Sequence, residues 1–336
     1  MALSTTAATR PHRPWVKWVR LAVSAVLLAV LITKFDADDL LPDDRSLPGA
    51  LAFLCSGIAI MGLSFLLASW RWQRVLAVYG AQVPLRTLLK HYLAGQFVGN
   101  ALPSTIGGDV LRVSRCARDV GPTEVAFASV VIERLTGFFA LPVLTFVGFL
   151  IEPSLLEKGR SWIAVVIAGS TLAILGVILL LAGSPKLAGR FKDHENWMRY
   201  IGIVHVGVDR LRRDPRDAWG ALGAAVAYQL SVVIAVYCAV HTIGLTISNA
   251  SILAFVPAVA MVQVLPISLS GLGVREGTLA LLWHPLSGGV PTAQSVAVGL
   301  LWYAMTVIVS LAAAPAFVFG HHDRDHKVTA PVAGSS

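Results

Sequence analysis

Long apolar segments recur along this chain, and shorter polar segments separate them. Each of six segments is predominantly apolar over at least about 18 residues, the length at which a helix can cross a bilayer. They cover residues 15–32, 47–70, 124–151, 162–182, 218–243 and 293–319. Of the 336 residues, 56% are hydrophobic and 14% are charged, whereas soluble domains carry about 25% charged residues. The pattern predicts an all-α fold, a polytopic membrane helical bundle with about six full spans.

Residues 92–102 form a shorter apolar segment that polar and helix-breaking residues interrupt. The segment contains Gly99 and Asn100, and Pro103 follows it. Basic residues flank the region on both sides, and those before it, starting at Arg71, are assigned to a cytoplasmic loop. Broken backbone at membrane depth must be buried in protein or line a wet cavity, because lipid offers no hydrogen bonds. We therefore predict a re-entrant hairpin that enters from the cytoplasm, turns near Pro103 and leaves on the same side.

Residues 251–284 contain a second break, at Gly271 and Gly273. If this segment is re-entrant from the opposite side, the two hairpins face each other inside the membrane. Paired broken segments of this kind point to a binding site near the midplane. In the alternative topology 251–269 and 278–300 cross separately, which gives seven or eight spans.

The distribution of lysine and arginine predicts the orientation. The bases before the first span have no acidic neighbours, whereas aspartates dominate the loop after it, and this asymmetry places the N-terminus in the cytoplasm. We expect a multi-pass protein of the cell inner (plasma) membrane with both termini cytoplasmic. Disordered ends at 1–14 and 321–336 would flank a transmembrane domain at 15–320. In the polar loop between the fourth and fifth spans, 193–213 is either a helix along the membrane or a solvated connector.

The net charge of +8 changes little in this picture. Its basic residues cluster between the apolar segments, so they are topology signals and contacts to lipid headgroups. We therefore expect no nucleic-acid partner.

Charged residues inside the membrane cost about 2.5–3.5 kcal/mol each on insertion scales, so they must face protein or water. The chain has six of them: Asp109, Arg112, Glu133, Arg134, Arg275 and Glu276. Adjacent residues on a helix point about 100° apart, so the two members of each adjacent pair need separate partners. One hypothesis pairs Arg134 with Glu276, and Glu133 with Arg275, as internal salt bridges. The other leaves at least one arginine available to an anionic ligand.

A phosphate is the anion that these residues favour. The guanidinium fork of arginine matches phosphate oxygens, and glycine-rich turns that open a helix offer backbone N–H groups to the same ligand. Gly107-Gly108 before 109–118 and Gly271-Leu272-Gly273 before Arg275 are predicted to be such turns.

The helix at 109–118 carries Asp109, Arg112 and Arg115 on one face. Alternatively, it is an amphipathic segment that rests among lipid headgroups. The candidate ligand-binding set is Asn100, Asp109, Arg112, Glu133, Arg134, Arg275 and Glu276. The candidate hairpin backbone set is Gly99, Pro103, Gly107, Gly108, Gly271 and Gly273.

Catalytic chemistry finds little support in the chain. The sequence has no GxSxG or HExxH motif, its histidines are scattered, and its three cysteines have no paired spacing. We therefore expect no enzymatic activity, no cofactor and no metal site.

Three blocks resemble one known family. They are the segments at 99–112, 133–137 and 266–277, and with their order and spacing the likeness covers roughly 15–320. The chain resembles the flippase-like membrane domain of lysylphosphatidylglycerol synthases, which also occurs as a free-standing membrane protein. In full-length synthases this kind of domain is thought to move an aminoacylated phospholipid that a separate soluble domain makes. The resemblance implies the transport half alone, because 321–336 leaves no room for a synthase domain.

Two hypotheses for function follow. The first is a lipid flippase or transporter that binds the phosphate-bearing headgroup of an anionic or glycosylated lipid between broken helices. The alternative is a non-catalytic membrane scaffold or partner of a lipid-modifying glycosyl- or acyltransferase.

Overall fold

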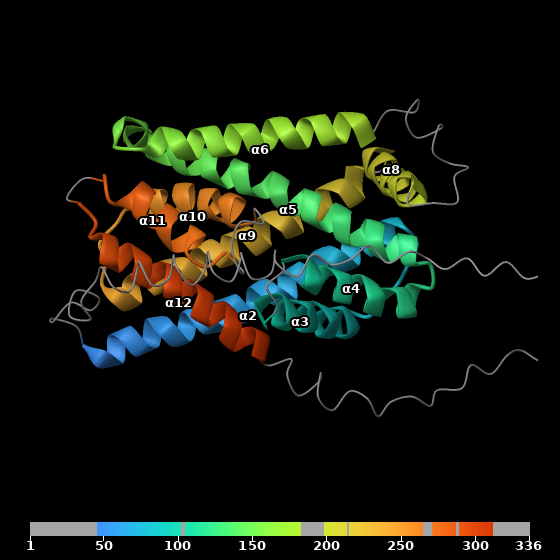
Figure 1. Cartoon of the computed structure of the whole chain (residues 1–336), viewed down its shortest axis with the longest axis horizontal. Helices are drawn as coiled ribbons and strands as arrows, with labels where there is room; N and C mark the ends of the chain where they lie inside the picture. The colour runs from blue at the N-terminus through green and yellow to red at the C-terminus, as the bar shows by residue number, and fades with distance from the viewer. Residues whose placement is uncertain are drawn as a thin grey trace, which may run out of the picture.

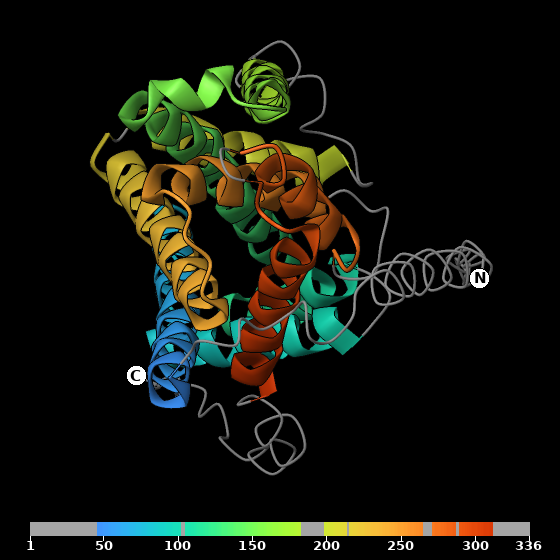
Figure 2. The same cartoon turned by 90° about the vertical axis from the view of Figure 1, so that its left-hand side faces the viewer.

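A computed structural model describes residues 46–101, 105–182, 198–213, 215–264, 271–286 and 289–311. Over these residues the secondary structure is helical and contains no strand. Most helices run along one long axis (Figure 1), and Figure 2, seen from one end of that axis, shows them arranged around a centre with α6 at the periphery. The predicted all-α bundle is confirmed.

Five helices are long and apolar enough to cross a membrane. They are α2 (Leu47–Val78), α5 (Thr123–Ile151), α6 (Ser161–Ala182), α9 (Pro215–Ile243) and α12 (Thr292–Leu311). Each corresponds to a predicted span, whereas the predicted span at 15–32 lies outside the described residues. The helix α2 extends eight residues beyond the predicted end at position 70, and this extension matters for the site.

Two pairs of shorter helices occupy opposite ends of the bundle (Figure 1). One pair is α3 (Leu85–Ala101) with α4 (Thr105–Val120), and the other is α10 (Asn249–Gln263) with α11 (Val274–Trp283). At 1.5 Å per residue, the 15 residues of α10 reach about 22 Å, which is less than the roughly 30 Å of a bilayer core. The two opposed hairpins are therefore present as paired short helices, although Pro103 and 265–270 at their tips lie outside the described residues.

Two glycines let α3 and α4 cross closely. A Cβ added to Gly108 would overlap the backbone carbonyl oxygen of Gly95, and one added to Gly95 would lie 2.6 Å from the side chain of Arg112. Small residues permit this approach between helices inside a membrane. The predicted turn at Gly107-Gly108 is wrong, because both residues lie within the first turn of α4, where Gly108 permits the close crossing with α3.

The helix α8 (Met198–Arg213) is seen nearly end-on in Figure 1, so it runs across the bundle axis. It is tied to the end of α2, where Arg210 Nη1 donates to the carbonyl oxygen of Val78 at 2.8 Å and Tyr79 Oη donates to that of Ile203 at 3.1 Å. The helical prediction for 193–213 is confirmed from position 198 onward.

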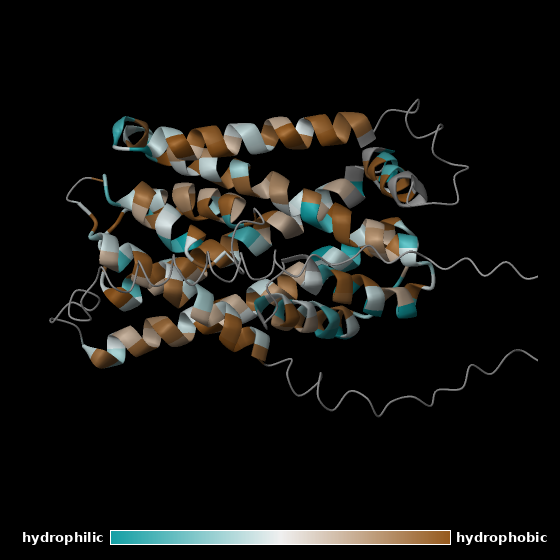
Figure 3. Cartoon of the chain, viewed as in Figure 1, coloured by the Kyte–Doolittle hydropathy of each residue, from teal (hydrophilic) through white to brown (hydrophobic). Residues whose placement is uncertain are grey.

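Apolar and polar residues are distributed as expected for a membrane bundle. In Figure 3, α6 is apolar along most of its length, whereas hydrophilic residues gather on helices in the middle of the molecule. The packed core between α2, α5, α9 and α10 includes Phe65, Val236 and Phe255. On α5, Gly148 lies so close to α10 that an added Cβ would be 2.5 Å from the backbone nitrogen of Ala254.

Candidate functional site

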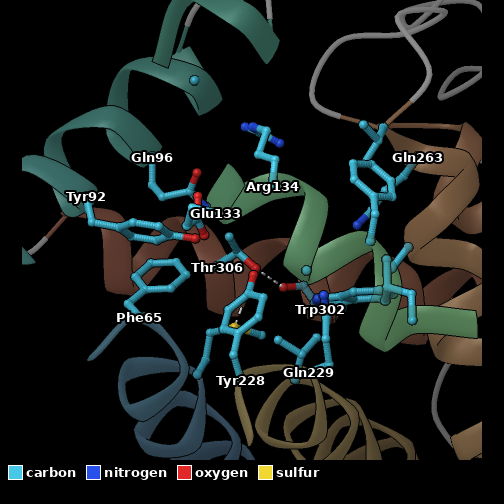
Figure 4. Close-up of a pocket in the computed structure, with 18 of the residues that line it drawn as sticks. Phe65, Tyr92, Gln96, Glu133, Arg134, Tyr228, Gln229, Gln263, Trp302 and Thr306 are labelled. Carbon is cyan, nitrogen blue, oxygen red and sulfur yellow. Dashed lines mark hydrogen bonds between the residues drawn. The ribbon is translucent and has the colours of Figure 1, made fainter. Parts of the chain in front are cut away.

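A cavity of about 240 Å³ lies among the helices. Its lining residues come from both short-helix pairs and from α2, α5, α9 and α12. Figure 4 shows aromatic and amide side chains around it, including Tyr92 and Tyr228 near Glu133. The broken helices therefore do meet at a polar cavity, as the sequence predicts.

Glu133 is the buried centre of the charges at this cavity. Its side chain is 1% exposed, and its carboxylate accepts hydrogen bonds from Arg71 Nη2 and from Arg112 Nη2, the latter at 3.1 Å. These residues belong to α5, α2 and α4, so one carboxylate connects three helices.

Arg112 lies between aromatic rings. Its guanidinium carbon is 4.3 Å from the ring centre of Trp72 and 4.5 Å from that of Tyr92. Aromatic faces attract cations most strongly where water is excluded, which compensates in part for burial of the charge. Its Nη1 atom is also 3.5 Å from the carboxylate of Asp109, three residues earlier on α4.

Arg134 points in a different direction from Glu133, as expected for neighbours on a helix. Its Nη2 atom lies 2.6 Å from Asp109 Oδ2, and its side chain retains 40% exposure. In Figure 4 it projects into the space between Gln96 of α3 and Gln263 of α10. Arg134 is therefore the accessible cation of the site, in contrast to Arg112, which is 4% exposed.

Arg71 is a site residue that the sequence reasoning missed, because it was assigned to a cytoplasmic loop. Its Nε and Nη1 atoms are buried and have no hydrogen-bond partner among the described residues. It packs over the ring of Tyr228 at 4.9 Å and against Gly137, where an added Cβ would be 2.8 Å from Nη1. The signal was the apolar periodicity after Arg71, since Trp72 and Val75 continue the buried face of α2.

We call Arg71, Asp109, Arg112, Glu133 and Arg134 the charge cluster. It contains three arginines and two carboxylates, which leaves one positive charge in excess. Buried charges are tolerated where they are paired, and an uncompensated one is costly. The cluster therefore favours an additional anion.

Arg275 approaches the same cavity from α11. Its Nε atom donates to Gln263 Oε1 at 3.0 Å, and its guanidinium carbon lies 5.1 Å from the ring centre of Trp302 and 5.2 Å from that of Tyr303. The predicted pairing of Glu133 with Arg275 is wrong, because Glu133 is bonded to Arg71 and Arg112.

The predicted pairing of Arg134 with Glu276 is wrong as well, because Arg134 pairs with Asp109. Glu276 instead accepts a hydrogen bond from the backbone nitrogen of Gly273 at 2.6 Å and so stabilises the start of α11. The turn at Gly271 and Gly273 is confirmed, with φ of +79° and +81°. However, the Gly273 amide is already bonded to this carboxylate, so it is not offered to a phosphate.

The remaining predicted residues are divided. Gly99 and Asn100 line the cavity, and Asn100 Nδ2 donates to Ser310 Oγ of α12 at 3.2 Å. Gly108 permits the close crossing of α3 and α4. The lining residues that the sequence reasoning did not single out include a set of aromatic and amide residues: Tyr92, Gln96, Tyr228, Gln229, Gln263, Trp302 and Tyr303.

Among the described residues, no group of three or more His, Cys, Asp or Glu side chains is positioned to hold a metal ion. Arginines, amides and aromatic rings converge on the cavity together with the carboxylate of Glu133, and the excess of arginines suits an anion.

Fold and site together define an integral, polytopic helical membrane protein with a polar cavity between opposed pairs of short helices. The chain belongs to the family described as the lysylphosphatidylglycerol synthase TM region, whose model matches residues 17–314. A comparison with curated proteins gave no match. The resemblance in the three sequence blocks is thereby confirmed at the level of the family.

Proposed function

We propose that this protein is a lipid transporter that holds the phosphate-bearing headgroup of an anionic or glycosylated lipid in the cavity. In this proposal the charge cluster binds the phosphate, and the lipid tails stay in the surrounding bilayer. The proposed setting is the plasma membrane, with the α3–α4 end and both termini on the cytoplasmic side, in line with the basic residues of that end.

The single observation that carries the proposal is the excess positive charge of the cluster. Three arginines share two carboxylates inside the bundle, where an unbalanced buried charge is far more costly than in water. An anionic headgroup would neutralise the cluster. A phosphate is favoured because it accepts several hydrogen bonds from guanidinium groups at once.

The hydrogen-bond donors of the site support the same ligand. Arg71 Nε and Nη1 and Arg112 Nε are buried without partners among the described residues, and buried donors are normally satisfied. Arg134 supplies a further, accessible donor. Amide side chains such as Gln96 and Gln229 also line the cavity and suit the hydroxyl groups of a glycerol or sugar.

The test is lipid movement in liposomes that contain the purified protein. Labelled anionic, glycosylated and zwitterionic lipids are compared, and their transfer between leaflets is followed by quenching of the label from outside. We expect faster transfer of anionic lipid than in empty liposomes, and a loss of most of this gain in Arg134→Gln. The matched control is Arg74→Gln, because Arg74 is an exposed arginine on α2 that stacks on Trp70.

Two results would contradict the proposal. One is transfer no faster than in empty liposomes for every lipid tested. The other is equal transfer by the Arg134→Gln and Arg74→Gln proteins, which would separate lipid movement from the cavity.

A further inference from the structure

The order of the helices repeats along the chain. Residues 47–151 comprise a long helix, two short helices and a long helix: α2, α3, α4 and α5. Residues 215–311 comprise the same series: α9, α10, α11 and α12. The helices α6 and α8 lie between the two series and belong to neither.

The two series run in opposite directions. In Figure 1, α2 starts at the end of the bundle where η2 (Pro153–Glu157) lies, whereas α9 finishes there. We call this the η2 end. The pair α10–α11 occupies the half of the bundle towards the η2 end, and α3–α4 occupies the other half (Figure 1). Corresponding elements are therefore antiparallel, as in an inverted repeat.

The packing of the helices follows the same relation. In the first series α2 packs with α3, α4 with α5, and α2 with α5; in the second, α9 packs with α10, α11 with α12, and α9 with α12. Between the series, the contact of α5 with α10 has its counterpart in that of α12 with α3. The helices α2 and α9 are the first helices of the two series, and they pack along each other. A twofold axis that exchanges the series would therefore pass between these two helices.

The residues that line the cavity match in register. Counted from the first residue of each helix, the eleventh, twelfth and fifteenth residues line it in both α5 and α12. These are Glu133, Arg134 and Gly137 in α5, and Trp302, Tyr303 and Thr306 in α12.

The short helices agree as well. The twelfth, fifteenth and sixteenth residues from the starts of α3 and α10 line the cavity in both. They are Gln96, Gly99 and Asn100 in α3, and Ala260, Gln263 and Val264 in the second series, where Val264 is the residue that directly follows α10. The residues at matching positions differ between the two series, so α5 supplies charges, Glu133 and Arg134, where α12 supplies the aromatic rings of Trp302 and Tyr303.

We propose that 47–151 and 215–311 are inverted copies of one four-helix unit. The site between them is exposed to one side by opening of the α5–α10 seam, and to the other side by opening of its counterpart, the contact of α12 with α3. The inference deepens the proposed transport function and rests on it for what is carried. Inverted units can exchange conformations, so the site can face either side while it stays in place.

The α5–α10 seam is closed at the η2 end by a polar latch. Ser248 Oγ donates to Glu152 Oε2 at 2.5 Å, which joins the residue that ends α5 to the residue that caps α10. Lys158 Nζ lies 3.2 Å from the other oxygen of Glu152. The latch lies at the rim of the bundle, outside the cavity, so it can be changed without altering the charge cluster.

The test is a reversible cross-link across this seam. Glu152→Cys and Ser248→Cys are combined in a chain whose three natural cysteines, Cys55, Cys116 and Cys238, are replaced by alanine. The pair is bridged by oxidation or by a short bifunctional thiol reagent, and bridging is verified by intact mass. The matched control joins helices within one unit, at His91 of α3 and Asp119 of α4, whose side chains are 2.7 Å apart.

We expect the bridged Glu152→Cys/Ser248→Cys protein to fall to the lipid-transfer rate of empty liposomes and to recover on reduction. The bridged His91→Cys/Asp119→Cys protein should keep its rate, because the two units can still move relative to each other. The inference would be overturned if the fully bridged Glu152→Cys/Ser248→Cys protein transferred lipid as fast as the same protein does after the bridge is chemically reduced.

The two proposals fail in different ways. Binding of a soluble short-chain anionic phospholipid should survive the seam bridge, because the cavity is unchanged. If the bridged protein both binds this phospholipid and transfers lipid at the unbridged rate, the alternating seam is rejected but the headgroup site is not. A lipid-transfer rate that is unchanged by Arg134→Gln would reject the headgroup site, whether or not the seam bridge stops transfer.

Discussion

Replacement of Arg71 by glutamine tests whether the excess charge of the cluster exists for a ligand. The change makes the cluster neutral, with two arginines and two carboxylates. It also replaces the donors at Nε and Nη1, which lack partners among the described residues, by a single neutral amide. Glu133 keeps Arg112 as a partner at 3.1 Å, so its negative charge is still paired. The variant therefore separates ligand binding from internal pairing better than a change at Glu133 would.

The expected loss of ligand affinity in Arg71→Gln follows from the lost interactions. A hydrogen bond to a charged group contributes about 1.5–3 kcal/mol, and glutamine keeps one neutral donor. A net loss of about 3 kcal/mol corresponds to roughly 100-fold weaker binding, at about 1.4 kcal/mol per tenfold. Arg74→Gln, three residues along α2 and exposed, should leave the affinity unchanged.

The measurement is titration of the detergent-solubilised protein with a short-chain anionic phospholipid, followed by calorimetry or by tryptophan fluorescence. Trp302 lines the cavity and Trp72 stacks on Arg112, so bound ligand should change the emission. Equal affinities of Arg71→Gln and Arg74→Gln, with both proteins folded, would refute the reasoning and reduce Arg71 to a structural ion-pair partner.

Three further outcomes are expected. Glu133→Gln removes the carboxylate that the buried Arg71 and Arg112 share, and it should lower the free energy of unfolding by about 3–5 kcal/mol. The loss is read from thermal unfolding, and a change no larger than that of Glu152→Gln would contradict this. Gly108→Ala should disturb the α3–α4 crossing and lower the free energy of unfolding by about 1–3 kcal/mol. Gly169 has open space around it, so Gly169→Ala should be neutral or slightly stabilising. Similar melting temperatures of the two variants would contradict the role of Gly108 in the crossing. The pKa of Glu152 is lowered chiefly by the hydrogen bond from Ser248, and further by a neighbouring lysine. Its stabilising effect is therefore present above the ordinary carboxyl pKa of 4.5 and lost as pH falls through the lowered value, so acid should cost the natural protein more thermal stability than Glu152→Gln.

The sequence predicts the helices well because apolar length and breaks are local properties. Five spans, the two short-helix pairs and the turn at Gly271 follow from composition read along the chain. The fact that Glu133 and Arg134 need separate partners also follows, since the helix period alone separates neighbouring side chains.

The partners themselves could not be predicted, because they depend on which helices pack together. Arg71 was assigned to a loop since a basic residue at the end of an apolar segment is typical of a span boundary. In the folded protein α2 continues to Val78 and carries Arg71 into the bundle. The glycines of α4 were misassigned for a related reason, since a glycine pair looks the same in a turn and in a close helix crossing.

The depth of the arginines has a kinetic consequence. Arg71 and Arg112 are each 4% exposed and fixed by packing, whereas Arg134 can be reached from outside the cluster. Accessible charges govern the rate of encounter, and buried hydrogen-bonded charges govern the rate of dissociation. A headgroup would therefore be captured by Arg134 and retained by Arg71 and Arg112. Release would be slow unless the carboxylate of Asp109, which already pairs with Arg134, replaced the phosphate as the partner of that arginine.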